Sequence, residues 1–298
     1  MRIGIVGATG NTGRVVADLV LNDGHDLRAI VRNPDSCADL ADRGAQTVSA
    51  NLDDPDTIDS ALEGVEAVYF CSPLPVGFDD PFALELERGR RFIKAARSAA
   101  VAHVVLLSAM GPERAPGVAL LETKRAIESD LIASGLGYTI LRPSMFMDNV
   151  ALAGPQPLLG MGLTWPYSSE KPIQPIAAAD IGAIAFEAVT GPVRNKVYDL
   201  VGPEAMTFPQ MAEDLGRALG AKIGFTEISD AIYVEHVGAA IGSPEVAQAI
   251  ADSYRLWERK GGGTGDATVL EKEFELSLTR FADFAANVAK AWRGDNLT

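Results

Sequence analysis

Apolar and polar positions follow two alternating periods along the first 142 residues. Short apolar runs rich in β-branched side chains are typical of strands buried on both faces of a parallel sheet. They occupy residues 2–6, 26–32, 45–50, 67–71, 103–107 and 138–141. Segments with apolar positions at helical spacing separate them, at residues 11–21, 34–42, 55–62, 82–99 and 120–133. This alternation predicts an α/β protein with a doubly wound parallel sheet and helices on both of its faces.

The pattern changes after Pro143. Eight glycine and proline residues fall between residues 154 and 175, which predicts a loop. A helix over 180–189 and a strand over 196–201 continue the sheet pattern, whereas residues 230–292 are expected to be mostly helical. We therefore expect two domains. Their predicted bounds are 1–150 and 175–202 for the sheet domain, and 151–174 and 203–298 for a smaller, mostly helical C-terminal domain that binds substrate.

A glycine-rich segment, Gly7-Ala8-Thr9-Gly10-Asn11-Thr12-Gly13, directly follows the first predicted strand and opens the first predicted helix. In a dinucleotide-binding Rossmann domain, Gly7 would permit the sharp turn, Gly10 the approach of backbone to the pyrophosphate, and Gly13 close helix packing. Free N–H groups at the helix start would face the phosphates. The side chains expected to add hydrogen bonds are those of Thr9, Asn11 and Thr12. The segment predicts an NAD(P)-binding Rossmann domain, with a glycine-rich turn that binds nothing as the alternative.

The end of the second predicted strand bears on the choice of cofactor. Domains specific for NAD place a carboxylate there, on the ribose 2′-hydroxyl. No Asp or Glu occurs at residues 27–34, and Arg32 occupies the end of the strand. A guanidinium group pairs well with a 2′-phosphate, so we predict NADP(H) as the cofactor. The alternative is that Arg32 is a solvated surface residue.

The composition narrows the range of partners. The net charge of −14 argues against nucleic acid or an anionic membrane as the main partner. Cys37 and Cys71 have no second cysteine nearby and the three histidines are scattered, so neither a disulfide framework nor a metal site is expected. The chain shows neither a signal peptide nor 18 consecutive apolar residues. We expect a cytoplasmic protein, and the sequence does not predict its oligomeric state.

Several motifs together make the sequence resemble the NmrA-like branch of the atypical short-chain dehydrogenases. They are the glycine-rich segment, Val31-Arg32-Asn33-Pro34, Leu106-Leu107-Ser108-Ala109, the run from Tyr138 to Asn149, Ala178-Ala179-Asp180-Ile181-Gly182 and Phe281-Ala282-Asp283-Phe284. That branch includes NADPH-dependent quinone reductases, relatives of isoflavone reductase and redox-sensing regulators. The resemblance implies a Rossmann fold and NADP(H), and it does not specify a substrate.

The same resemblance implies two catalytic candidates. Ser108 matches the serine of the short-chain dehydrogenases and Lys124 matches the lysine, but Leu120 occupies the tyrosine position. The usual phenolic proton donor is therefore missing, and in isoflavone-reductase-like relatives the lysine itself serves as acid or base. Lys124 also falls within the apolar stripe of its predicted helix, whereas a solvated lysine normally lies opposite that stripe. The alternatives are a surface Lys124 paired with Glu128, and a Ser108 that only caps the strand end.

Further contacts are expected where predicted strands end, because ligands of doubly wound sheets lie outside the carboxyl ends of the strands. The additional residues expected to contact the cofactor are Cys71, Ser72, Pro73, Pro143 and Phe146, besides Lys124. The residues expected to contact a flat, apolar substrate are Met145, Met147, Trp165 and Tyr167. Ordinary core packing is the alternative for the methionines and the aromatic residues.

Two functions remain open at this stage. The first is an oxidoreductase that transfers hydride from NADPH to a small quinone, carbonyl or conjugated compound. The second is a sensor that binds NADP(H) without turnover and acts through a protein partner, which the missing tyrosine motivates. An NAD-dependent epimerase or dehydratase shares the fold, but Arg32 and the missing tyrosine both argue against it.

Overall fold

The computed structural model describes residues 1–72, 74–111, 113, 115–152, 154–260 and 263–294. The chain forms two compact units, each assembled from segments that are distant in sequence. The first unit comprises Met1–Ala109, Leu121–Arg142 and Ala179–Asp199. The second comprises Met110–Leu120, Pro143–Ala178 and Leu200–Thr298. The predicted domain bounds stay a prediction.

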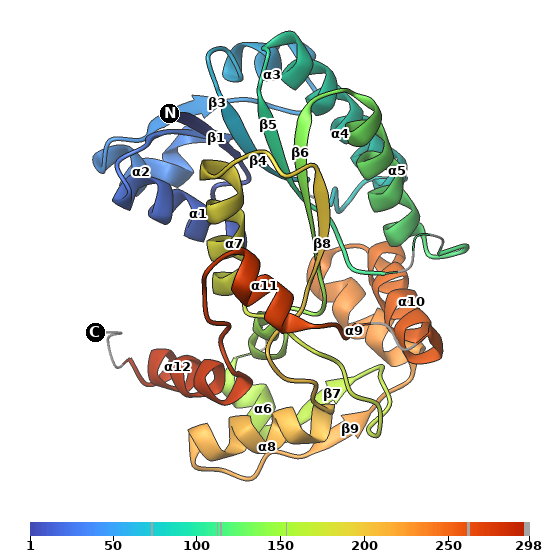
Figure 1. The fold of residues 1–298 in the computed structure, drawn as a ribbon. Helices are drawn as coiled ribbons and strands as arrows, with labels where there is room; N and C mark the ends of the chain where they lie inside the picture. Colours follow the sequence, from blue (N-terminus) through green and yellow to red (C-terminus); the bar gives the residue numbers. More distant parts are fainter. Residues whose placement is uncertain (73, 112, 114, 153, 261–262, 295–298) are drawn as a thin grey trace. The chain divides into compact units, whose positions relative to one another are not determined.

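The first unit is built on a seven-stranded sheet with the order β3-β2-β1-β4-β5-β6-β8 (Figure 1). The strands are β1 (Arg2–Val6), β2 (Asp26–Val31), β3 (Gln46–Ser49), β4 (Ala67–Cys71), β5 (His103–Leu107), β6 (Gly137–Pro143) and β8 (Lys196–Leu200). The neighbouring pairs from β3 to β6 are parallel. The strand order reverses between β1 and β4, the position at which such sheets bind ligands. The predicted doubly wound α/β fold is confirmed.

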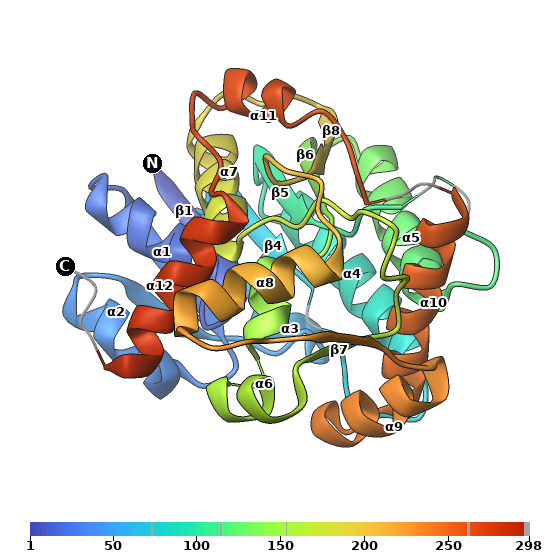
Figure 2. The same ribbon diagram turned by 90° about the horizontal axis from the view of Figure 1, so that it is seen from below.

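Helices cover both faces of this sheet. They are α1 (Asn11–Asn22), the 3-10 helix η1 (Pro34–Cys37), α2 (Ala38–Asp42), α3 (Pro55–Ala61), α4 (Pro81–Ser98), α5 (Ala119–Ala133) and α7 (Ala178–Thr190). Figures 1 and 2 show α1 and α7 on one face, and α4 and α5 on the other. The core beneath α3, α4 and α5 includes Phe70 and Phe92, whose rings stack at 3.8 Å.

A glycine brings α4 and α5 close together. A Cβ atom at Gly89 of α4 would lie 2.8 Å from the Cγ1 atom of Ile127 of α5. Contacts this short do not occur between real side chains, so only glycine permits this separation of the two helices. This close packing positions side chains on the same two helices that are described below.

The second unit combines helices with a two-stranded parallel sheet formed by β7 (Leu163–Trp165) and β9 (Phe225–Glu227). Its helices are η2 (Met147–Ala151), α6 (Pro155–Met161), α8 (Phe208–Leu219), α9 (Asp230–Ile241), α10 (Pro244–Lys260), α11 (Ala267–Glu273) and α12 (Phe281–Arg293). The prediction of a loop over residues 154–175 is wrong, because α6 and β7 lie within it. Gly154 and Gly162, both with positive φ, bound α6, and Pro155 occupies its first turn, where proline is tolerated.

Candidate cofactor site and active site

The glycine-rich segment forms a tight phosphate loop between β1 and α1. Gly7 has a φ of +93°, and its carbonyl oxygen accepts a hydrogen bond from the N–H of Gly10 at 2.9 Å. A Cβ atom at Gly13 would lie 2.1 Å from that same oxygen, so no side chain fits there. Among the described residues, no side chain caps α1, and the first turn of the helix contains no acidic residue. The N–H groups at this helix start are therefore available to an anion.

The polar side chains of the loop differ in exposure. Thr9 and Asn11 are exposed at the loop. The Thr12 hydroxyl is buried and hydrogen-bonded to the hydroxyl of Tyr69 at 2.8 Å. Thr12 therefore links α1 to β4 through its side chain, and only its backbone N–H faces the helix start.

A cavity of about 610 Å³ extends from the phosphate loop along the carboxyl ends of β2, β3 and β4. Its lining residues are Val6, Gly7, Thr9, Ile30, Val31, Arg32, Asn33, Ser36, Ala50, Asn51, Leu52, Ile58, Leu74, Pro75, Val76, Phe78 and Arg88. None of these described residues is acidic, and two are arginines. Arg32 is exposed at the end of β2 and makes no ion pair with a described residue. The cavity therefore combines apolar walls with positive charge, which suits an anionic nucleotide.

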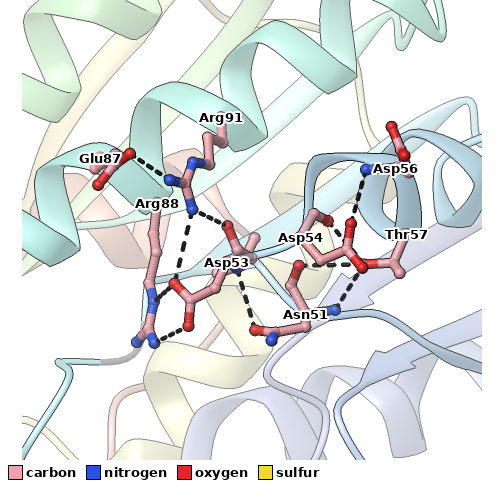
Figure 3. A network of polar contacts seen from close by, with 9 residues as sticks. Asn51, Asp53, Asp54, Asp56, Thr57, Glu87, Arg88 and Arg91 are labelled. Atoms are coloured by element: carbon pink, nitrogen blue, oxygen red, sulfur yellow. Dashed lines mark hydrogen bonds and ion pairs between the residues drawn. The ribbon is translucent and has the colours of Figure 1, made fainter.

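Arg88, which the sequence did not single out, belongs to this cavity. Its Nε and Nη2 atoms donate to the carboxylate of Asp53 at 2.8 and 2.6 Å (Figure 3), and its guanidinium group lies 5.4 Å from the ring centre of Phe78. Arg88 holds the pKa of Asp53 below its usual value against the opposing effect of burial, and Arg91 and Arg32 lower it further. Asp53 is thus committed to its arginine neighbours. Arg88 ties the turn after β3 to the segment after β4.

Lys124 lies on α5 and pairs with Glu85 of α4, with 2.5 Å between Nζ and Oε1. The side chains are 12% and 0% exposed, so the alternative of a surface lysine is wrong. The pairing with Glu128 that this alternative included is also wrong, because the Glu128 carboxylate binds Ser108, Arg125 and Arg142. Burial alone lowers the pKa of Lys124, but Glu85 outweighs it and the net shift is upward. Lys124 is therefore an ammonium group at neutral pH, suited to stabilising negative charge rather than to accepting a proton.

Ser108 belongs to a separate buried network. Its hydroxyl donates to the Glu128 carboxylate, which also binds Arg125 and Arg142. Arg142 Nε lies 3.0 Å from Oε1 of Glu128, and Arg125 Nη2 donates to the Ala109 carbonyl at 2.8 Å. The Ser108 hydroxyl is therefore engaged by a carboxylate rather than by the strand end. Sequence reasoning missed this network because its members lie on three different elements.

The other residues expected to contact the cofactor lie in both units. Cys71, the last residue of β4, lies beside the phosphate loop. A Cβ atom built at Gly7 would lie 3.4 Å from the Cβ atom of Cys71. The Ser72 hydroxyl is buried without a hydrogen-bond partner among the described residues. Pro73 lies outside the described residues. In the second unit, Pro143 is buried and Phe146 is half-buried.

The residues expected to contact substrate lie within the second unit. Met145, Met147 and Tyr167 are at most 2% exposed, so they present almost no surface to a ligand. Trp165 is half-buried and packs on Phe208, with 5.5 Å between ring centres. The aromatic cluster also includes Tyr233, Tyr254, Trp257 and Phe225. The structure thus uses most of these side chains as core, and the substrate role of Trp165 stays a prediction.

Two further observations concern metal sites and helices that could cross a membrane. Among the described residues there is no group of three or more His, Cys, Asp and Glu side chains that could hold a metal ion. Within the same residues, no helix has the length and apolar character that crossing a membrane requires.

Comparison with known proteins places this geometry in a family. The model of the NmrA-like family matches residues 1–285. Quinone oxidoreductase 2 of Escherichia coli (strain K12) is 28% identical over 290 residues, covering 96% of this chain and 98% of the relative. The NAD(P)H azoreductase of Xenophilus azovorans is 28% identical over 254 residues, covering 85% and 86% of the two chains.

A solved structure extends the match to three dimensions. The crystal structure of an NADPH-dependent quinone oxidoreductase from Escherichia coli, complexed with NADPH, superimposes with a TM-score of 0.82 at 27% identity. The match covers 96% of this chain and 99% of that chain. With the family model spanning almost the whole sequence, the resemblance seen in the motifs is confirmed: the chain belongs to the NmrA-like family.

Proposed function

We propose that this protein is an NADPH-dependent oxidoreductase that reduces a small quinone, carbonyl or conjugated compound by hydride transfer. One observation carries the proposal: the cavity at the strand-order reversal joins a phosphate loop to Arg32, which makes no ion pair with a described residue, and has no carboxylate among its described lining residues. The second arginine of the cavity, Arg88, is paired with Asp53. A carboxylate there would favour the 2′-hydroxyl of NAD, whereas guanidinium groups favour a 2′-phosphate. The reductase activities named for the relatives support the same reaction class.

The residues of the first unit fit the cofactor's phosphates. Backbone of the loop takes the space that a side chain at Gly13 would fill. Separately, no described side chain caps the start of α1, so its N–H groups are available to the pyrophosphate. Arg32 would hold the 2′-phosphate. When bound, NADPH supplies the hydride, and the protein supplies orientation, charge and exclusion of water.

Lys124 would stabilise the charge that develops on the substrate. A quinone that accepts hydride becomes a phenolate, and a fixed ammonium group lowers the energy of this developing negative oxygen. The oxygen can take its proton from solvent afterwards, so the absence of a tyrosine at Leu120 is tolerable for a quinone. A simple ketone would need a stronger proton donor during the transfer. Quinones are therefore the favoured substrate class.

The test follows the oxidation of NADPH by the purified protein with quinones, enones, azo compounds and aldehydes. We expect turnover with quinones and a kcat at least tenfold lower in Lys124→Met, since a missing charge donor costs a few kcal/mol. Lys94→Met removes an exposed lysine of α4 and serves as the control. Turnover that survives Lys124→Met unchanged would leave the oxidoreductase and remove Lys124 from the active site.

The sensor remains the second candidate. It is favoured by the engagement of the Ser108 hydroxyl by Glu128 and by Leu120 at the tyrosine position. Tight NADPH binding without turnover of any compound in the panel, together with a partner whose affinity changes with the cofactor's redox state, would establish it.

A further inference from the structure

Glu85 is a fully buried carboxylate on the second turn of α4. One of its oxygens accepts the hydrogen bond from Lys124 at 2.5 Å. The other, Oε2, is shielded from solvent and has no hydrogen-bond partner among the described residues. A buried carboxylate oxygen without a partner is costly, because it loses water and gains nothing in return.

The Glu85–Lys124 ion pair contributes little to the stability of the folded state. Taking two charges out of water costs several kcal/mol per ion, and the attraction offsets this only when the remaining lone pairs are also satisfied. Here they are not, and an apolar pair of similar volume would serve the core as well. The presence of a half-satisfied ion pair therefore calls for a reason other than folding.

The surroundings of the pair supply that reason. Three groups act electrostatically on Lys124: Glu85 from α4, Cys71 from the end of β4 and Glu128 from α5 itself. Glu128 is bound by two arginines, and burial raises the pKa of the Cys71 thiol so that it stays neutral. Among the described groups that act on Lys124, Glu85 is thus the one negative charge that is not paired with another cation.

We propose that Glu85 is a positioning residue of the active site, which fixes the Lys124 side chain and keeps its ammonium group charged while that group acts on the substrate oxygen. The inference rests on the proposed function for the role of Lys124. Glu85 itself contacts neither cofactor nor substrate. Its effect is transmitted entirely through Lys124.

The protonation of Lys124 can be measured without turnover. Acylation by trace acetic anhydride requires the neutral amine, so the pH profile of labelling at Lys124, read by mass spectrometry in the full chain, reports its titration. In Glu85→Gln, the largest of the effects that oppose burial is removed, and the labelling midpoint should fall by at least one pH unit. Glu87→Gln, an exposed carboxylate two residues further along α4, is the control and should leave the profile unchanged.

Kinetics then connect the charge to the reaction. In Glu85→Gln we expect kcat to fall roughly tenfold more at pH 9 than at pH 7 relative to the wild type, with the NADPH Kd changed less than about threefold. The double variant Glu85→Gln/Lys124→Met should be no slower than Lys124→Met alone, because Glu85 acts only through Lys124.

Each outcome decides the inference separately from the proposed function. Absence of turnover in the wild type would refute the oxidoreductase, while a shifted labelling midpoint would still establish that Glu85 controls the charge of Lys124. An unchanged labelling profile, or a double variant much slower than Lys124→Met, would overturn the inference. If Glu85→Gln does not fold, Glu85→Asp decides: its carboxylate is withdrawn by one methylene, so its midpoint should fall below that of the wild type.

Discussion

Replacing Arg32 by alanine should weaken NADPH binding and leave NADH binding almost unchanged. The two cofactors differ only in the 2′-phosphate, so they form a matched pair of ligands. A hydrogen bond to a charged group contributes about 1.5–3 kcal/mol, which corresponds to roughly 10–150-fold in Kd. Arg32 is exposed at the rim of the cavity, where solvent screens the charge, so we expect about tenfold.

The assay is a fluorescence titration of each cofactor into the full chain at low and high salt. The loss for NADPH should shrink as salt rises, since the interaction lies near the surface. Arg97→Ala removes the same charge from an exposed position of the first unit that does not line this cavity, and it controls for the overall field. Equal losses for NADPH and NADH in Arg32→Ala, or an equal loss in Arg97→Ala, would refute the assignment of the 2′-phosphate to Arg32.

Three further variants test other parts of the first unit. Gly13→Ala should abolish NADPH binding in a folded protein, because the new Cβ atom would lie 2.1 Å from the Gly7 oxygen; measurable binding by titration would contradict this. Glu128→Gln should lower stability by about 3–5 kcal/mol, measured by denaturant unfolding, because it removes the buried carboxylate charge to which two buried guanidinium groups bind. Burial, with a smaller effect of Arg194, lowers the pKa of His103 from 6.5 to about 4. The folded state therefore favours the neutral ring. This preference contributes about 3 kcal/mol to the free energy of unfolding above pH 6.5, and the contribution is lost as the pH falls to 4. His103→Gln should therefore show a smaller fall in melting temperature between pH 6.5 and 4 than the wild type. The same pH profile in both proteins would contradict this role of His103.

Much of the first unit could be predicted because its strands are buried on both faces. Such strands are short apolar runs, and the predicted bounds of 2–6, 67–71 and 103–107 match β1, β4 and β5. In contrast, β7 and β9 are only three residues long and pair across some sixty residues of sequence. A pattern that short has no detectable period, so neither strand could be predicted from the sequence.

The site divides in the same way. The phosphate loop could be predicted because its chemistry is local: strand, glycines and helix follow one another directly. The apolar placement of Lys124 on its helix also followed from spacing, and Ile127 and Leu131 of the same face are buried. Its partner could not be predicted, because spacing considers only pairs within one helix, whereas Glu85 comes from another. Arg88 was missed for the same reason.

The close packing at Gly89 has a consequence for the chemistry. Gly89 lies one turn after Glu85 on α4, and Ile127 lies one turn after Lys124 on α5. The separation between helices that the missing side chain permits is therefore also the separation across which the ion pair forms. A single methyl group added at Gly89 forces the Ile127 side chain or the helix that carries it to shift, and a shift of the helix stretches that contact. Gly89, which bears no functional group, thus affects the distance between Glu85 and Lys124. A substitution at Gly89 can therefore change reactivity although both members of the ion pair are unchanged.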